Sequence, residues 1–239
     1  MNESIQAIAP LNLALAFVPV LLVIAILWKW SLQAGNAVYA ILRMLIQLLL
    51  VGYILTTIFA AEQAWIVVAV MLIMVIAASW IALGTVKPMR SKLYLQGFIS
   101  IALGGGLTLL LVTQLVISLD PWFEPRYMIP LAGMIFANSM NSISLAAERL
   151  AAELSRDVEF TQARNEAFQA AFIPTINSML AVGLVSLPGM MTGQILSGVS
   201  PIVAAHYQIV VMCMIFGSAG LSTACFLRIS RRQFVQQAA

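Results

Sequence analysis

The stretch AWIVVAVMLIMVIAASWIAL, residues 64–83, decides the fold class of this chain. Its 20 consecutive residues carry no charged side chain, and an α-helix needs about 20 apolar residues to cross a bilayer. Over the whole chain of 239 residues, 62% are hydrophobic and 9% are charged, whereas about 25% of residues are charged in a soluble domain. The sequence therefore predicts an all-α, polytopic membrane protein.

Six further runs of similar length and polarity accompany this one along the chain. The first of them has no basic residues before it and no small-residue cleavage site after it, which favours a membrane span over a signal peptide. We expect a single transmembrane domain over residues 1–239. The seven expected spans are residues 8–28, 37–60, 64–83, 97–118, 128–147, 170–189 and 206–227.

The distribution of Lys and Arg predicts the orientation of these spans. With the N-terminus outside and the C-terminus cytoplasmic, ten of the twelve basic residues fall on the cytoplasmic side, as the positive-inside tendency requires. Arg126 lies in an external loop, and Arg43 lies within the second span. The net charge of +3 is thus explained by topology and needs no nucleic-acid partner. We expect the cytoplasmic (inner) membrane of a bacterium.

Polar side chains within the spans are candidates for function. Arg43 and Gln47 lie four residues apart and so share one helix face. They either anchor and join helices or line a cavity. In the fifth span, Asn138, Asn141 and Ser142 also share a face, and buried amides without partners are costly in lipid. This polar stripe is either an interhelical contact or part of a substrate path.

The stretch GLVSLPGMMTGQILSG, residues 183–198, interrupts the hydrophobic pattern near the expected end of the sixth span. Pro188 is expected to end or kink that helix, and the glycines at 189, 193 and 198 to permit turns or close contacts. Irregular backbone at membrane depth occurs only beside protein or a water-filled cavity. The residues expected along a path here are Pro188, Gly189, Met190, Met191 and Gln194. Met190 and Met191 either fill space or act as soft metal ligands.

The longest polar stretch, residues 148–169, indicates a helix that is bent or broken near residues 155–157. The chain contains no G-x-x-x-x-G-K-[ST] motif, so it has no P-loop for ATP.

Several motifs together resemble the FetB-type permeases, the membrane subunits of iron-export ABC transporters, which have plant relatives linked to aluminium tolerance. The matching segments are RMLIQLLLVGY at 43–53, IPLAGMIFANSM at 129–140, AAFIPTINSMLAVGLVSLPGMMTGQILSG at 170–198 and SPIVAAHYQIVV at 200–211. The resemblance implies an exporter of iron or another metal species. It also implies a separate FetA-like P-loop ATPase subunit and two copies of each subunit. ATP and Mg would be bound by that partner, and this chain would bind no cofactor itself.

In such a permease a cytoplasmic coupling helix docks on the ATPase. The resemblance places this element at residues 149–166. The residues implied in ATPase coupling are Arg156, Asp157, Val158, Glu159, Phe160, Arg164 and Glu166.

The cargo is not decided by the residues alone, because the spans contain no Asp or Glu and iron usually binds carboxylate or imidazole ligands. An organic cargo carried by an ABC permease and a stand-alone secondary transporter both remain open. A retinal-type pump or similar seven-helix receptor is disfavoured, because the last span of this chain contains no lysine for a Schiff base. A membrane enzyme is disfavoured because the chain offers no nucleophile, base and acid that could act together.

Overall fold

The computed structural model describes residues 8–59 and 63–238 of the chain. The chain divides into two compact units, Met1–Ala60 and Ala61–Ala239. Within the described ranges every regular element is helical, which confirms the all-α class. Among the described residues, six helices are long and apolar enough to cross a membrane, as judged by length and composition.

The first unit consists of two apolar helical segments that are joined by a short turn. The helices α1 (Pro10–Leu15) and α2 (Val18–Lys29) form the first segment, and α3 (Ala34–Phe59) forms the second. Residues of α2 and α3 line a small apolar groove between them. None of the described side chains in this unit is buried, so its stability depends on an apolar environment such as lipid.

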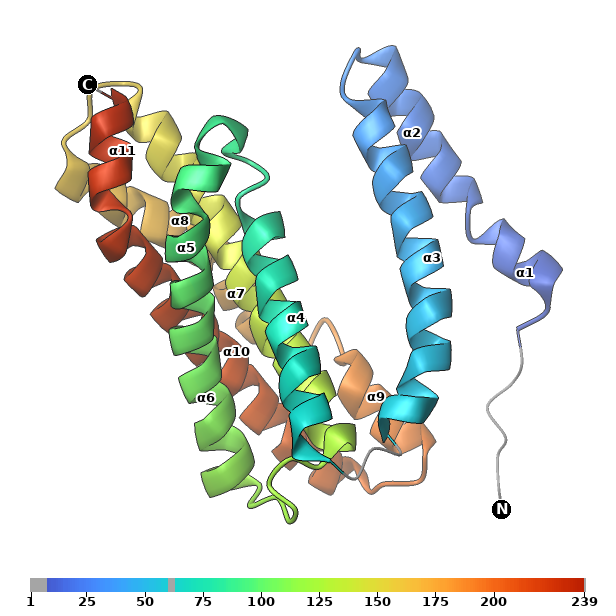
Figure 1. Cartoon of the computed structure of the whole chain (residues 1–239). Coiled ribbons are helices and arrows are strands. Elements are labelled where there is room, and N and C mark those ends of the chain that lie inside the picture. The colour runs from blue at the N-terminus through green and yellow to red at the C-terminus, as the bar shows by residue number, and fades with distance from the viewer. Residues whose placement is uncertain (1–7, 60–62, 239) are drawn as a thin grey trace. The chain divides into compact units, whose positions relative to one another are not determined.

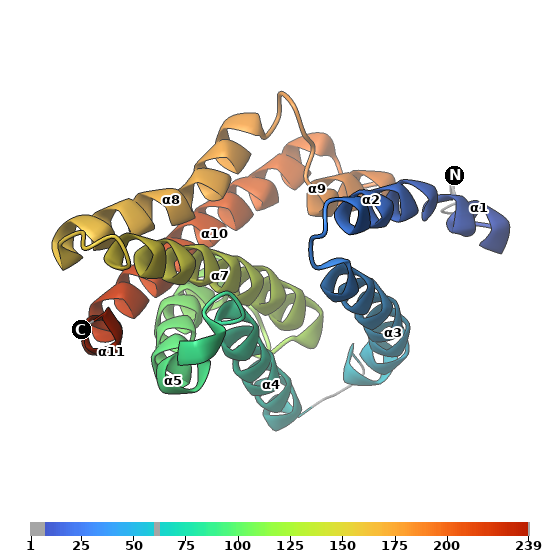
Figure 2. The same ribbon diagram turned by 90° about the horizontal axis from the view of Figure 1, so that it is seen from above.

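The second unit is a helical bundle with α7 at its centre. Viewed from above in Figure 2, α7 lies between α8 on one side and α4 on the other, and α10 crosses it and also contacts α5. The elements of this unit are α4 (Ala64–Ala82), η1 (Lys87–Met89), α5 (Arg90–Ser100), η2 (Ile101–Gly105), α6 (Gly106–Leu110), η3 (Leu111–Val116), α7 (Pro125–Leu154), α8 (Phe160–Ala181), α9 (Gly189–Leu196), α10 (Pro201–Ile229) and α11 (Arg231–Ala238).

The core of the second unit is formed mainly by α7 and α10. Ile135, Ile143 and Leu150 of α7 are fully buried, as is Phe226 of α10, and Met214 of α10 is almost so. These α7 positions recur every seven or eight residues, so they form one apolar stripe on the helix. Packing of this stripe against α10 defines the interface around which the remaining helices are arranged.

The fourth span, which runs over residues 87–116, contains two π-helical segments. The segments η2 and η3 interrupt the α-helical pattern on either side of α6. Gly104 in η2 lies directly against Ser222 of α10. The absence of a side chain at this position allows the two backbones to approach closely.

The sixth expected span, residues 170–189, differs from the structure in its boundaries. The helix α8 begins at Phe160 and ends at Ala181, and Pro174 lies inside it. A turn follows at residues 182–188, where Gly183 adopts a positive φ of 82°. The expectation that Pro188 ends or kinks this helix is therefore wrong, because the chain leaves the helix at a glycine turn seven residues earlier.

Positive charge is concentrated at one end of the second unit. The α4–α5 connection, the α7–α8 junction and α11 all lie at that end (Figure 1). The turns and helix ends gathered there hold nine of the ten basic residues of Ala61–Ala239, the exception being Arg126. The assignment of this end to the cytoplasmic side stays a prediction.

Candidate functional site

A buried seam of hydroxyl groups joins α7 to α10. The Ser222 hydroxyl donates a hydrogen bond of 3.1 Å to the Ser139 hydroxyl, and the Thr223 hydroxyl donates one of 2.8 Å to the Ser142 hydroxyl. All four side chains are buried. Ser142, expected in a polar stripe with Asn138 and Asn141, thus lies within the helix interface. Ser139 was not singled out from the sequence, because its hydroxyl partner lies 83 residues further along the chain.

The two asparagines lie on a more open face of α7 than the hydroxyl seam. The Asn138 amide donates a hydrogen bond of 2.8 Å to the Met134 carbonyl one turn earlier, and the side chain is half-buried. Asn141 is exposed, together with Ala137 and Leu145 on the same face. An exposed amide on a membrane-spanning helix must face protein or water. This face of α7 is therefore a candidate contact with solvent, cargo or another helix.

The helix α9 presents the glycine- and methionine-rich segment. Pro188 precedes the helix with extended backbone angles, and Met190, Met191 and Gln194 are half-buried. Thr192 donates a hydrogen bond of 3.1 Å to the Pro188 carbonyl. The Gln194 side-chain oxygen is buried and has no donor among the described residues.

The glycines of this segment divide into two kinds. Gly198 has a positive φ of 90°, so it forms the turn that leads into α10, as the sequence predicts. Gly189 and Gly193 lie in α9 with no neighbouring atom within 4 Å of an added Cβ. The expectation of close contacts at these two positions is therefore wrong.

Gln208 of α10 is a second buried amide that sequence reasoning did not identify. Its side chain is 5% exposed, and its oxygen has no donor among the residues the structure describes. Most buried polar groups in proteins are hydrogen-bonded. Gln194 and Gln208 thus each hold a buried acceptor oxygen without a donor among the described residues, one in α9 and one in α10, two helices that contact each other.

The first unit carries the remaining residues expected on a path. Arg43 and Gln47 are exposed and lie four residues apart on α3. They share a face of that helix, as expected from their spacing.

The junction between α7 and α8 is an ordered turn with a charged surface. The break expected near residues 155–157 is confirmed, since α7 ends at Leu154 and α8 begins at Phe160. Arg149 pairs with Glu153 at 2.7 Å and with Glu166 at 3.4 Å. Arg156 approaches the buried Glu153 carboxylate at 3.5 Å. These ion pairs connect the end of α7 to the start of α8.

Glu159 caps the first turn of α8. Its carboxylate accepts hydrogen bonds from the Thr161 hydroxyl at 2.8 Å and from the Gln162 backbone N–H at 3.3 Å. Hydrogen bonds from Thr161, above all, lower the pKa of this carboxyl. Arg156, Asp157 and Glu159 are exposed and Val158 is half-buried, so the turn offers both charge and apolar surface.

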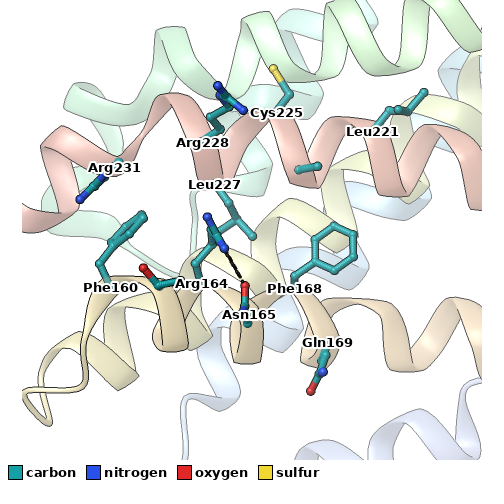
Figure 3. A pocket seen from close by; sticks show the side chains of 12 residues that line it. Phe160, Arg164, Asn165, Phe168, Gln169, Leu221, Cys225, Leu227, Arg228 and Arg231 are labelled. Carbon is teal, nitrogen blue, oxygen red and sulfur yellow. Dashed lines mark hydrogen bonds between the residues drawn. The ribbon is translucent and has the colours of Figure 1, made fainter.

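A groove of about 930 Å³ lies beside this junction, between α8 and α10. Figure 3 shows Arg164 on α8 with its guanidinium bonded to Asn165, near Phe160 and Phe168. Arg164 therefore lines the groove, whereas Arg156 and Asp157 lie on the exposed turn.

The described residues contain no group of three or more His, Cys, Asp or Glu side chains that could hold a metal ion. A cargo metal would have to contact other donors, such as amides, hydroxyls or thioethers. Met190 and Met191 stay candidates for such contacts.

These features define a polytopic α-helical membrane protein with polar groups in its spans. The chain belongs to the Uncharacterised protein family (UPF0014), whose model matches residues 10–235. It is 37% identical over 227 residues to the UPF0014 membrane protein slr1647 of Synechocystis sp., covering 88% of this chain and 87% of the relative. No solved structure matches.

Two further relatives carry functional names. The "Probable iron export permease protein FetB" of Escherichia coli is 35% identical over 234 residues, covering 90% of this chain and 89% of that protein. The "Protein ALUMINUM SENSITIVE 3" of Arabidopsis thaliana is 34% identical over 227 residues, covering 88% and 81%. The resemblance noted from the motifs is confirmed, and the similarity supports a membrane permease.

Proposed function

We propose that this chain is the permease subunit of an ATP-driven ABC transporter that exports iron or another metal species across a bacterial cytoplasmic membrane. The observation that carries this proposal is the 35% identity, over nearly the whole chain, to a protein named as an iron export permease. A separate FetA-like ATPase subunit would bind ATP and Mg, and two copies of each subunit would assemble.

The proposed path runs along the open face of α7 and past α9. Asn138 and Asn141 offer amide oxygens on α7, and Met190 and Met191 offer thioethers on α9. The oxygens of Gln194 and Gln208, which are buried and have no donor among the described residues, would add acceptors once α9 and α10 move apart. Amide oxygens and thioethers bind a passing cation more weakly than a full set of carboxylates or imidazoles. Weak ligands suit transport, because a cargo that enters a site must also leave it.

Three further residues contribute to this proposal in different ways. Ser142 would position the path through its bond to Thr223 rather than line it, since it is only 3% exposed. Arg43 and Gln47 are exposed on one face of α3. There they would offer a cationic group and an amide to the cargo, and the arginine would suit an anionic metal complex.

The α7–α8 junction is the proposed coupling element. Arg156, Asp157, Glu159 and the start of α8 at Phe160 form the surface offered to the ATPase. The Arg156–Glu153 ion pair ties this surface to α7, and the Arg149–Glu166 pair joins α7 to α8. A movement imposed on the turn would therefore be transmitted to α7 and α8 together, as alternating access by rigid bodies requires.

ATP hydrolysis in nanodiscs tests the proposal. The chain is co-expressed with a candidate P-loop ATPase subunit from the same organism, and hydrolysis is measured with Fe(II), Fe(III)-citrate, other metals and small organic solutes. We expect stimulation by an iron species, and we expect Asn141→Leu to remove most of it while the complex stays assembled. Leu115→Ala, a change at an exposed apolar residue of another span, is the control and should keep the stimulation.

Three results would contradict parts of the proposal. Stimulation of ATP hydrolysis by organic solutes but by no metal would indicate an organic cargo instead of a metal. Equal stimulation of the Asn141→Leu variant and the wild-type protein would remove the α7 face from the path. A chain that transports without any ATPase subunit would instead be a stand-alone carrier.

A further inference from the structure

The groove between α8 and α10 is lined by basic side chains at one end and mainly by apolar side chains at the other. On α8 its lining residues recur at helical spacing from Phe160 to Gln169, and on α10 from Leu221 to Arg228, with Arg231 at the start of α11. One face of each helix therefore contributes to the groove. Phe160 at the start of α8 and Arg231 at the start of α11 line the groove, and the starts of these two helices lie toward the basic end of the bundle, where the α7–α8 junction also lies (Figure 1).

Three arginines line the outer part of the groove, and no Asp or Glu does. Arg164, Arg228 and Arg231 take part in no ion pair among the described residues, unlike Arg149 and Arg156, which pair with Glu153. The outer part of the groove therefore carries cationic groups whose charge is not neutralised by direct pairing.

The neighbours of these arginines do not satisfy their charge. Arg164 donates to the neutral Asn165 side-chain oxygen, from Nε at 3.2 Å and from Nη2 at 2.9 Å. The Arg231 guanidinium lies 5.1 Å from the centre of the Phe160 ring. After the hydrogen bonds from Thr161 and Gln162, the charge of Arg231 also helps to lower the pKa of the Glu159 carboxyl, although the two side chains form no ion pair. An anion entering the groove would thus meet Arg164 and Arg228 without a paired carboxylate among the described residues, and Arg231 with Glu159 in its vicinity.

The inner part of the groove is mostly apolar. Phe168, Leu221, Ala224 and Leu227 line it, together with the polar side chain of Gln169. Leu221 and Arg228 are seven residues apart, or about 10 Å along the helix. Because α10 ends at Ile229, the arginines lie at the end of a membrane-spanning helix and the apolar residues lie deeper. A phospholipid has the same order of groups, with a phosphate at the boundary and acyl chains inside.

We propose that the α8–α10 groove binds one anionic phospholipid. Its phosphate would lie among Arg164, Arg228 and Arg231, and an acyl chain would follow Phe168 and Leu221. Guanidinium groups bind phosphate oxygens through paired, charge-assisted hydrogen bonds. Basic pockets between membrane helices are known to hold anionic headgroups. Arg164 would then serve the lipid site rather than ATPase docking, and the site is independent of the cargo.

The test uses the purified full-length chain without ATPase or cargo, so its failure leaves the proposed transport function untouched. Phosphatidylglycerol, phosphatidylcholine and inorganic phosphate are each titrated, with thermal unfolding and native mass spectrometry as readouts. The test variant is R228Q/R231Q, and the control is R126Q/R232Q, which removes the same charge outside the groove. A third variant, R164Q, tests the α8 wall alone.

We expect phosphatidylglycerol to bind and stabilise the wild-type and control proteins. R228Q/R231Q should bind it at least about tenfold more weakly, and R164Q should also bind it more weakly, while both keep their lipid-free unfolding temperatures. If R228Q/R231Q does not fold, R164Q decides alone.

Four outcomes would overturn the proposal. Equal weakening in test and control variants would show attraction by net charge only. Equal binding of phosphatidylcholine would show an apolar groove without headgroup recognition. Competition by millimolar inorganic phosphate would indicate a soluble anion site. A change from dimer to monomer in R228Q/R231Q would assign the groove to an interface between two copies.

Discussion

Replacement of Gly104 by alanine should destabilise the bundle by disrupting the α7–α10 seam. A Cβ built at Gly104 lies 2.5 Å from the Ser222 nitrogen and 2.8 Å from its Cα, and ordinary contact begins at 3.4 Å. Because these neighbours are backbone atoms of α10, that helix or η2 would have to move by about 0.9 Å. If α10 is the helix that moves, and it moves away from α7, a shift of this size would stretch both hydroxyl bonds of the seam, now 3.1 and 2.8 Å, beyond effective length.

The free energy of unfolding that Gly104→Ala is expected to lose has two parts, which add to about 2 to 4 kcal/mol. Overpacking of a tight interface costs about 1 to 3 kcal/mol, and each interhelical hydrogen bond in a membrane contributes about 0.6 kcal/mol. For a chain of this size, roughly 2 to 4 °C of unfolding temperature correspond to each kcal/mol. The Gly104→Ala variant should therefore unfold at least about 4 °C below the wild-type protein.

Gly106→Ala provides a matched control two residues along the same span. An added Cβ at Gly106 meets no atom within 4 Å, so the change should be neutral or stabilise the helix by up to about 1 kcal/mol. Thermal unfolding in detergent compares the two variants. Equal unfolding temperatures for Gly104→Ala and Gly106→Ala would refute the close approach of η2 to α10.

The α7–α8 turn and the α9–α10 turn yield two further predictions. Arg156→Glu should reduce co-purification of the ATPase subunit without reducing membrane insertion. Arg126→Glu, at the opposite end of the bundle, is the control and should leave co-purification unchanged. An equal yield of ATPase subunit with both variants would argue against the turn as a docking surface. Gly198→Ala should lower the unfolding temperature because its φ of 90° disfavours a side chain, while Gly193→Ala in α9 should not. A Gly198→Ala protein as stable as Gly193→Ala would contradict the left-handed turn.

Hydropathy was sufficient to locate most spans because membrane insertion selects long apolar runs. The expected spans at 37–60, 64–83 and 206–227 correspond to α3, α4 and α10. The end of α8 was misplaced because a proline was taken as the terminator. Pro174 is accommodated within the helix, whereas the turn occurs at Gly183.

The site residues were harder to predict because their surroundings come from distant parts of the chain. Asn138, Asn141 and Ser142 share a helix face by spacing, yet only Ser142 has a buried partner, Thr223. The pairing depends on how α10 lies against α7, which no local pattern specifies. The buried, unpaired amide of Gln208 could not be predicted from the sequence either, because a single glutamine in an apolar helix does not reveal whether a hydrogen-bond donor is nearby.

The π-helical segments give the fourth span a property that a regular α-helix lacks. Each π turn contains more residues than the α-helical turn that would replace it. If one turn of η2 became α-helical, one residue would be released, which corresponds to a rotation of about 100° for everything beyond it. Conversion of η2 would thus turn α6 and η3 about their axis without pulling the span out of the bilayer. Residues 101–105 are thus the place in the fourth span where a change of helix type would rotate the residues beyond it, and Gly104 of this segment lies in contact with α10.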